Sequence, residues 1–286
     1  MKFLLMGVLL IISVHANANT EKRLQIGITL HPYYSYVSNI VGDRADVLPL
    51  IGSGFNPHNY QLNPADIERL NTLDALVVNG IGHDLFATST VDRLQPKNLT
   101  VIYANQDVPL IGHDEKVNPH TFVSIDAAIR QVYTIAKGLG ALDPDNKTFF
   151  LRNALTYAKK LRSLKKPVQQ ALLNKDLSTI RIASTHGAYA YLLQEFGLTV
   201  SAIIEPAHGV SPSASQLEET IQTIRKLKVD VLFTELNMAN QYVSLIENET
   251  GIKIYYFSHM THGEYSKDMV ENEMRYNLSK LAEALQ

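Results

Sequence analysis

The feature that most constrains the fold is an alternation of short apolar runs with amphipathic stretches, which occurs twice along the chain. Continuous apolar runs at residues 75–79 and 100–103 predict strands that are buried on both faces. Helical patterns separate such runs, and one of them begins with Asn63 as N-cap and Pro64 at its first position. Strands that alternate with helices indicate a mostly parallel α/β sheet.

A long amphipathic stretch, residues 143–175, separates the two alternating regions. Its apolar residues recur with helical spacing between charged ones, which predicts a helix of roughly 25 residues that begins at Asp143 and kinks or ends at Pro167. We therefore expect an α/β protein with two Rossmann-like lobes joined by one long spanning helix. The expected division is an N-terminal lobe at 19–142, a linking helix at 143–177 and a C-terminal lobe at 178–286. A cleft between such lobes, near strand ends, is a common ligand site.

The first 18 residues predict a cleavable secretory signal peptide. Lys2 supplies the positive start, residues 3–14 are apolar and uncharged, and Ala16-Asn17-Ala18 forms an A-x-A cleavage pattern. The apolar run is too short to span a bilayer comfortably. The sequence contains no cysteine, so no thiol in it can carry a lipid or form a disulfide. These features favour export to the periplasm of a Gram-negative bacterium.

The overall composition excludes one class of partner. The formal net charge is −2, whereas a nucleic-acid-binding protein needs a basic face. Apolar residues make up 45% of the chain, which is enough to build sizeable cores. We therefore expect a folded protein that does not bind nucleic acid.

Three histidines lie where an α/β fold presents its site residues, in the loops that follow strands: His58, His120 and His186. His58 and His120 each follow an Asn-Pro pair, and proline restricts both its own backbone and that of the preceding residue. Imidazole is the commonest metal ligand, and converging imidazoles suit Zn²⁺. Because about 60 residues separate neighbours in this set, they meet only across a large fold. An ion bound by all three would bridge the two lobes.

Other polar residues lie near the same expected cleft. His259 and His262 follow the last predicted strand, 252–257, and a solvated loop is the alternative role for both. His83 follows the strand at 75–79 and would border the cleft, but we do not count it among the ligands. Glu205 and Glu235 also end strands, and nothing in the sequence marks either one as a catalytic base.

Several segments carry a recognisable order of residues. Residues 54–66 contain Pro-His, an aromatic residue and Pro-x-Asp; 77–84 contain Asn-Gly; 118–122 read Asn-Pro-His-Thr-Phe; and 184–191 read Ser-Thr-His-Gly-Ala-Tyr-Ala-Tyr. In these segments, and over about residues 24–285, the chain resembles the solute-binding proteins of bacterial ABC importers for zinc and manganese, the cluster 9 or zinc-uptake receptor family. Asn118 and Phe122 stand where that family usually has Asp and Trp, and Asp84 stands in place of its Glu.

The resemblance implies two α/β lobes joined by a rigid spanning helix, with one metal ion bound between them. The ligands that it implies are His58, His120 and His186. Manganese receptors of the family tend to have Glu at the third position, so His186 favours zinc. This agrees with the preference of Mn²⁺ for carboxylates.

The fourth ligand stays open. Many members of the family carry an Asp after the last strand, and Ser258 or His259 occupies that place here. The alternatives are His259, His262, Ser258, a water molecule or no ligand. We expect His259, because it lies nearer the end of the strand.

The implied function is high-affinity capture of Zn²⁺, with Mn²⁺ as the alternative, and delivery to the membrane permease of an ABC importer. A periplasmic metallochaperone is a further candidate partner, and we expect a monomer without enzymatic activity. A zinc-dependent hydrolase is the competing function, because three histidines and an open position suit a catalytic zinc. The sequence contains neither His-Glu-x-x-His nor Gly-x-Ser-x-Gly. A scaffold with a structural metal is the third alternative.

Overall fold

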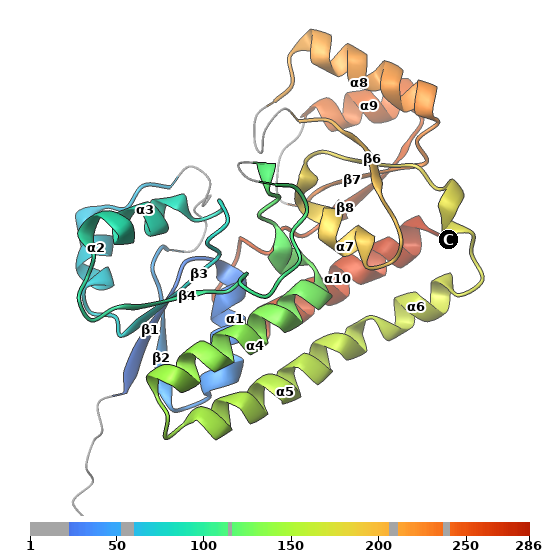
Figure 1. The fold of residues 1–286 in the computed structure, drawn as a ribbon. Coiled ribbons are helices and arrows are strands. Elements are labelled where there is room, and N and C mark those ends of the chain that lie inside the picture. Colours follow the sequence, from blue (N-terminus) through green and yellow to red (C-terminus); the bar gives the residue numbers. More distant parts are fainter. Residues whose placement is uncertain (1–22, 53–59, 114–115, 206–210, 237–240) are drawn as a thin grey trace, which may run out of the picture.

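The computed structural model describes residues 23–52, 60–113, 116–205, 211–236 and 241–286. The predicted signal peptide and His58 lie outside these ranges. Within them the chain forms two α/β lobes joined by helices, as expected (Figure 1).

The first lobe is built on a parallel four-stranded sheet in the order β2-β1-β3-β4. Its strands are β1 (Leu24–Ile28), β2 (Ala45–Pro49), β3 (Ala75–Val78) and β4 (Thr100–Tyr103). Its helices are α1 (His31–Val41), α2 (Pro64–Leu70) and α3 (Leu85–Leu94). The predicted N-cap of α2 is confirmed, because the Asn63 side chain accepts a hydrogen bond from the Asp66 amide and Pro64 begins the helix.

The second lobe repeats this plan with the strand order β6-β5-β7-β8. Its strands are β5 (Ile182–Ser184), β6 (Val200–Ile203), β7 (Val231–Glu235) and β8 (Lys253–Phe257). Its helices are α7 (Ala190–Gln194), α8 (Ala214–Leu227), α9 (Gln241–Thr250) and α10 (Met269–Ala284), with 3-10 turns at Leu177–Thr179 and Gly187–Tyr189. Strand β3 is buried throughout, as its continuous apolar sequence predicted, and β7 is buried throughout as well.

The connection between the lobes differs from the single helix that we expected. It contains α4 (Ile125–Leu142), α5 (Lys147–Leu164) and α6 (Lys166–Leu172). The Asp143 side chain accepts hydrogen bonds from the Asn146 amide and side chain, at 3.1 and 2.8 Å, so α5 begins only after this turn. Pro167 lacks an N–H donor and lies in the first turn of α6, so the helix pattern stops after Leu164 and restarts at Lys166.

These helices form a layer that reaches both lobes (Figure 1). Helix α5 packs against α4, α1 and α10, and α10 also packs on β8 and α6. A single apolar cluster runs through this layer, from Ile26 in β1 to Phe257 in β8. The two lobes are therefore joined by a packed helical core. Among the described helices, none has the length and apolar character needed to cross a membrane.

Candidate metal centre

Four histidines meet between the two lobes, at the carboxyl ends of parallel strands. His83 follows β3, and His120 precedes a 3-10 turn at Thr121–Val123 in the connection after β4. In the second lobe, His186 follows β5 and His259 follows β8. All four are at most 6% exposed. Each lobe therefore contributes two buried imidazoles to one site.

Three of the four rings, those of His83, His120 and His259, are close enough to share one ion, and the ring of His186 lies beside those of His120 and His259. The ring centroid of His120 lies 5.0 Å from those of His83 and His186 and 5.1 Å from that of His259. Ring nitrogens of His83, His120 and His259 all lie within 4.8 Å of one another. Two nitrogens bound to one tetrahedral zinc lie roughly 3.3 Å apart, given bonds of about 2.0–2.1 Å. Small side-chain rotations would thus bring these nitrogens around one ion.

His83 is positioned by a rigid turn after β3. The buried side chain of Asp84 accepts hydrogen bonds from the Asn79 amide at 2.6 Å, the Gly80 amide at 3.0 Å and the Thr29 hydroxyl at 2.6 Å. Gly80 has φ +74°, a left-handed conformation that favours glycine. Burial raises the pKa of the Asp84 carboxyl, although its three hydrogen bonds oppose that shift. This network fixes the backbone on which His83 stands.

Asn118 orients His120 and also contacts the second lobe. Its side-chain oxygen accepts a hydrogen bond from His120 Nδ1 at 2.8 Å, so Nε2 of that ring is left as the lone-pair donor for a metal. Its side-chain amide donates to the carbonyl of Gly187, next to His186, at 2.6 Å. The carbonyl of Asn118 accepts a hydrogen bond from the Tyr191 hydroxyl at 2.8 Å. Asn118 therefore links a predicted ligand of each lobe.

The position of His259 depends on the end of β8. Asn277 of α10 accepts from the Ser258 amide at 2.7 Å and donates to the Ser258 carbonyl at 2.9 Å, which fixes the backbone beside His259. His259 Nδ1 lies 2.9 Å from the Thr261 hydroxyl, and in the tautomer whose Nδ1–H donates to that hydroxyl, Nε2 carries the lone pair that a metal needs. The described contact of His262 is to Thr261 as well, at 3.2 Å.

One buried carboxylate lies beside the two histidines of the second lobe. Glu235 is the last residue of β7 and is 1% exposed. Its two carboxylate oxygens lie 3.9 Å from His186 Nδ1 and 3.8 Å from His259 Nδ1. In a site of low polarity, this negative charge offsets part of the charge of a bound cation. The sequence analysis noted only that Glu235 ends a strand.

The structure thus brings together three of the four histidines that the sequence analysis selected, His120, His186 and His259. It adds His83, which the sequence analysis did not count. His58 lies outside the described residues, and metal ligation by any of these histidines stays a prediction.

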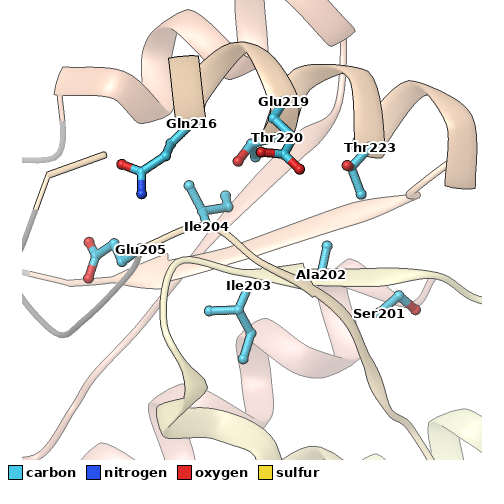
Figure 2. A pocket seen from close by; sticks show the side chains of 9 residues that line it. All are labelled: Ser201, Ala202, Ile203, Ile204, Glu205, Gln216, Glu219, Thr220 and Thr223. Carbon is cyan, nitrogen blue, oxygen red and sulfur yellow. The ribbon is translucent and has the colours of Figure 1, made fainter. Parts of the chain in front are cut away.

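A separate cavity of about 330 Å³ lies between β6 and α8. Figure 2 shows Glu205, at the end of β6, facing Gln216 of α8 across this space. Glu205 also accepts a hydrogen bond from Tyr242 of α9. The described residues that line the cavity include no histidine, so it is distinct from the histidine cluster.

The fold and the site together define a two-lobed α/β protein with a buried histidine cluster between its lobes. The chain belongs to the family described as zinc-uptake complex component A, periplasmic (ZnuA), whose family model matches residues 26–284.

Solved structures with the same fold include the substrate-binding protein (SBP) FpvC of Pseudomonas aeruginosa. Its complex with Ni²⁺ shares 51% sequence identity with this chain, covers 93% of it and 97% of the FpvC chain, and has a TM-score of 0.88. A complex of FpvC with Mn²⁺ has the same identity and TM-score and covers 99% of that chain.

Two curated relatives are more distant. The zinc-binding lipoprotein AdcA of Streptococcus pneumoniae is 27% identical over 86% of this chain, which spans only 52% of AdcA. The manganese ABC transporter substrate-binding lipoprotein PsaA of Streptococcus mitis is 26% identical, over 94% of this chain and 91% of PsaA.

Proposed function

We propose that this protein captures a divalent transition-metal ion, Zn²⁺ in first place and Mn²⁺ as the alternative, and delivers it to the permease of an ABC importer. The single observation that carries the proposal is the buried cluster of four imidazoles, two from each lobe. A cation held by both lobes stabilises their closed arrangement, because it binds that arrangement better than an open one. Such an arrangement suits reversible capture and release of an ion as cargo.

The donor set supports zinc over manganese. Imidazole nitrogens suit Zn²⁺, Ni²⁺ and Cu²⁺, whereas Mn²⁺ favours carboxylate and water oxygens. The described cluster contains four imidazoles and one nearby carboxylate, that of Glu235. The relatives named above are described with zinc, manganese or nickel, so the choice among these ions requires a direct competition experiment.

The number of imidazoles in the cluster also makes a zinc-dependent hydrolase a weaker alternative. A catalytic zinc keeps three protein ligands and an open position for water. Four converging imidazoles would fill that position, and the family match gives the hydrolase no support.

The proposal includes a cellular location and binding partners for the protein. Two of the relatives are named as lipoproteins, whereas this sequence has an A-x-A pattern at residues 16–18 and no cysteine. We therefore propose a periplasmic protein released by cleavage of its signal peptide. It would act as a monomer with the ABC permease as its main partner, and a metallochaperone is a second candidate partner.

Metal binding and uptake test this function together. Chelator-treated protein is titrated with Zn²⁺ and with Mn²⁺ in competition with an indicator of known affinity, and one tightly bound ion per chain with zinc preferred is expected. Uptake of labelled zinc should fall in cells that lack the protein and return when it is supplied. Unchanged uptake of both metals in those cells, or hydrolysis of an ester or amide by the zinc-loaded protein, would contradict the proposal.

A further inference from the structure

The histidine after β3 has no assigned role, although it occupies the same space as the expected ligands. His83 is 1% exposed, and its ring centroid lies 5.0 Å from that of His120 and 5.7 Å from that of His259. One of its ring nitrogens belongs to the set that lies within 4.8 Å of ring nitrogens of His120 and His259. These three residues come from both lobes, so a nitrogen of His83 faces the point where the lobes meet.

Hydrogen bonds fix the backbone next to His83 and so hold its ring in this position. Asp84 is buried and bonded to two amides of the turn and to the hydroxyl of Thr29, which is 55 positions earlier in the sequence. Phe122 packs against the ring of His83, and the ring centroid of Phe122 lies 5.1 Å from that of His83 and 5.7 Å from that of His259. A buried imidazole with an apolar wall on one side and two further imidazoles on the other has the setting of a metal ligand.

We propose that His83 is itself a ligand of the transported ion, so that among the described residues the first lobe contributes His83 and His120 and the second contributes His186 and His259. This inference rests on the proposed function. Four neutral imidazoles would leave the full charge of a divalent ion in a buried site, where an uncompensated charge is costly. The Glu235 carboxylate, near His186 and His259, supplies the compensating charge. The site would therefore select a nitrogen-preferring divalent ion, with a buried carboxylate beside it.

The alternative role for His83 is packing alone, and His83→Phe separates the two roles. Phenylalanine keeps an aromatic ring against Phe122 but removes both nitrogens. His113→Phe makes the same change at an exposed histidine and is the matched control. Chelator-treated proteins are titrated with Co²⁺, whose visible absorption bands report its ligands, and then with Zn²⁺ in competition. We expect His83→Phe to weaken binding at least 100-fold and to shift the Co²⁺ bands, and His113→Phe to match the wild type.

Three outcomes are distinguishable. Binding by His83→Phe within about threefold of the wild type, with an unchanged Co²⁺ spectrum, would overturn the role of His83 and leave the proposed function intact. A wild type that binds neither ion would overturn both proposals. If His83→Phe does not fold, a structure of the zinc-loaded wild type decides: a His83 ring nitrogen within about 2.3 Å of the ion supports ligation, and a distance above about 3 Å overturns it.

Discussion

At the scale of single residues, the histidine cluster depends on the side chains that orient the histidines as well as on the histidines themselves. Asn118 is the clearest case. Its side-chain oxygen accepts a hydrogen bond from Nδ1–H of His120, and its side-chain amide donates one to the carbonyl of Gly187 in the other lobe. Such a partner fixes the tautomer and orientation of a ligating histidine. From the sequence, Asn118 was noted only because it stands where the family usually has Asp, and its contacts with both lobes were not predicted.

Asn118→Ala should weaken zinc binding by about 10- to 100-fold, the usual effect of removing the hydrogen-bond partner of a metal-bound histidine. Asn118→Asp is the control, since a carboxylate oxygen still accepts the proton of His120 Nδ1. Competition titrations of the three proteins measure the effect. Equal losses in both variants would mean that the contact with Gly187, rather than the orientation of His120, is what matters.

His259 and His262 lie three residues apart, yet only His259 contacts the other histidine rings in the described structure. Zinc that binds only the folded protein adds about 4 kcal/mol of stability at a thousandfold excess over the Kd. His259→Ala should remove much of the zinc-dependent rise in melting temperature, and His262→Ala should leave it. Thermal melts with zinc and with chelator measure this difference, and the reverse pattern would place the ligand at His262.

At the scale of helices and strands, the sequence predicted what depends on local pattern. The continuous apolar runs at 75–79 and 100–103 predicted β3 and β4 as strands, and β3 is buried throughout, as expected. The expected burial of β4 on both faces is wrong, because β4 lies at the edge of its sheet and exposes Thr100 and Tyr103. The kink or end predicted at Pro167 is confirmed to within two residues, because α5 ends at Leu164 and α6 begins at Lys166. His83 was correctly placed at the border of the cleft, but its position inside the histidine cluster was missed because it depends on Asp84, whose partner Thr29 is far away in the sequence. His120 was found because Pro119 restricts the chain locally.

Helix α1 holds the loop after β8 through a buried histidine. The His31 ring stacks on Tyr265 at 4.0 Å, and its Nε2–H donates to the carbonyl of Gly263 at 2.9 Å. Burial lowers the pKa of His31 below its usual value of 6.5, although the hydrogen bond to Gly263 opposes this shift. The unfolded chain therefore takes up this proton at a higher pH than the folded protein does.

The neutral His31 side chain therefore makes its full contribution to folding stability above the unfolded pKa of about 6.5. This contribution falls as the pH drops through and below that value. His31→Phe keeps the ring stack on Tyr265 but cannot titrate. Denaturant melts of metal-free protein between about pH 8 and pH 5 should show a smaller loss of stability in His31→Phe than in the wild type. Identical pH profiles would exclude His31 as a contributor.

At the scale of the whole molecule, the connecting helices are linked to the second lobe by a buried ion pair as well as by apolar packing. Lys165, between α5 and α6, lies 2.8 Å from Asp126 at the start of α4 and 3.1 Å from Glu195 after α7. Glu195 also accepts hydrogen bonds from the Ser124 hydroxyl and the Asp126 amide. One lysine thus joins two helices of the connecting layer to the second lobe.

Lys165→Met should destabilise the protein by about 3 kcal/mol, because it leaves the buried Glu195 carboxylate without its cation. Lys166→Met changes the exposed neighbour and should cost less than about 0.5 kcal/mol. Urea denaturation of the two variants and the wild type gives these differences. Equal stability of the two variants would show that the buried pair contributes nothing.

The central claim is that one metal ion binds between the lobes at the histidine cluster, and anomalous X-ray diffraction tests it most directly. Crystals of zinc-loaded protein are measured at energies above and below the zinc absorption edge. We predict a single strong anomalous peak about 2.0–2.1 Å from ring nitrogens of His120, His186 and His259. A peak in the cavity between β6 and α8, or no peak near these three rings in crystals with one zinc per chain, would contradict the account.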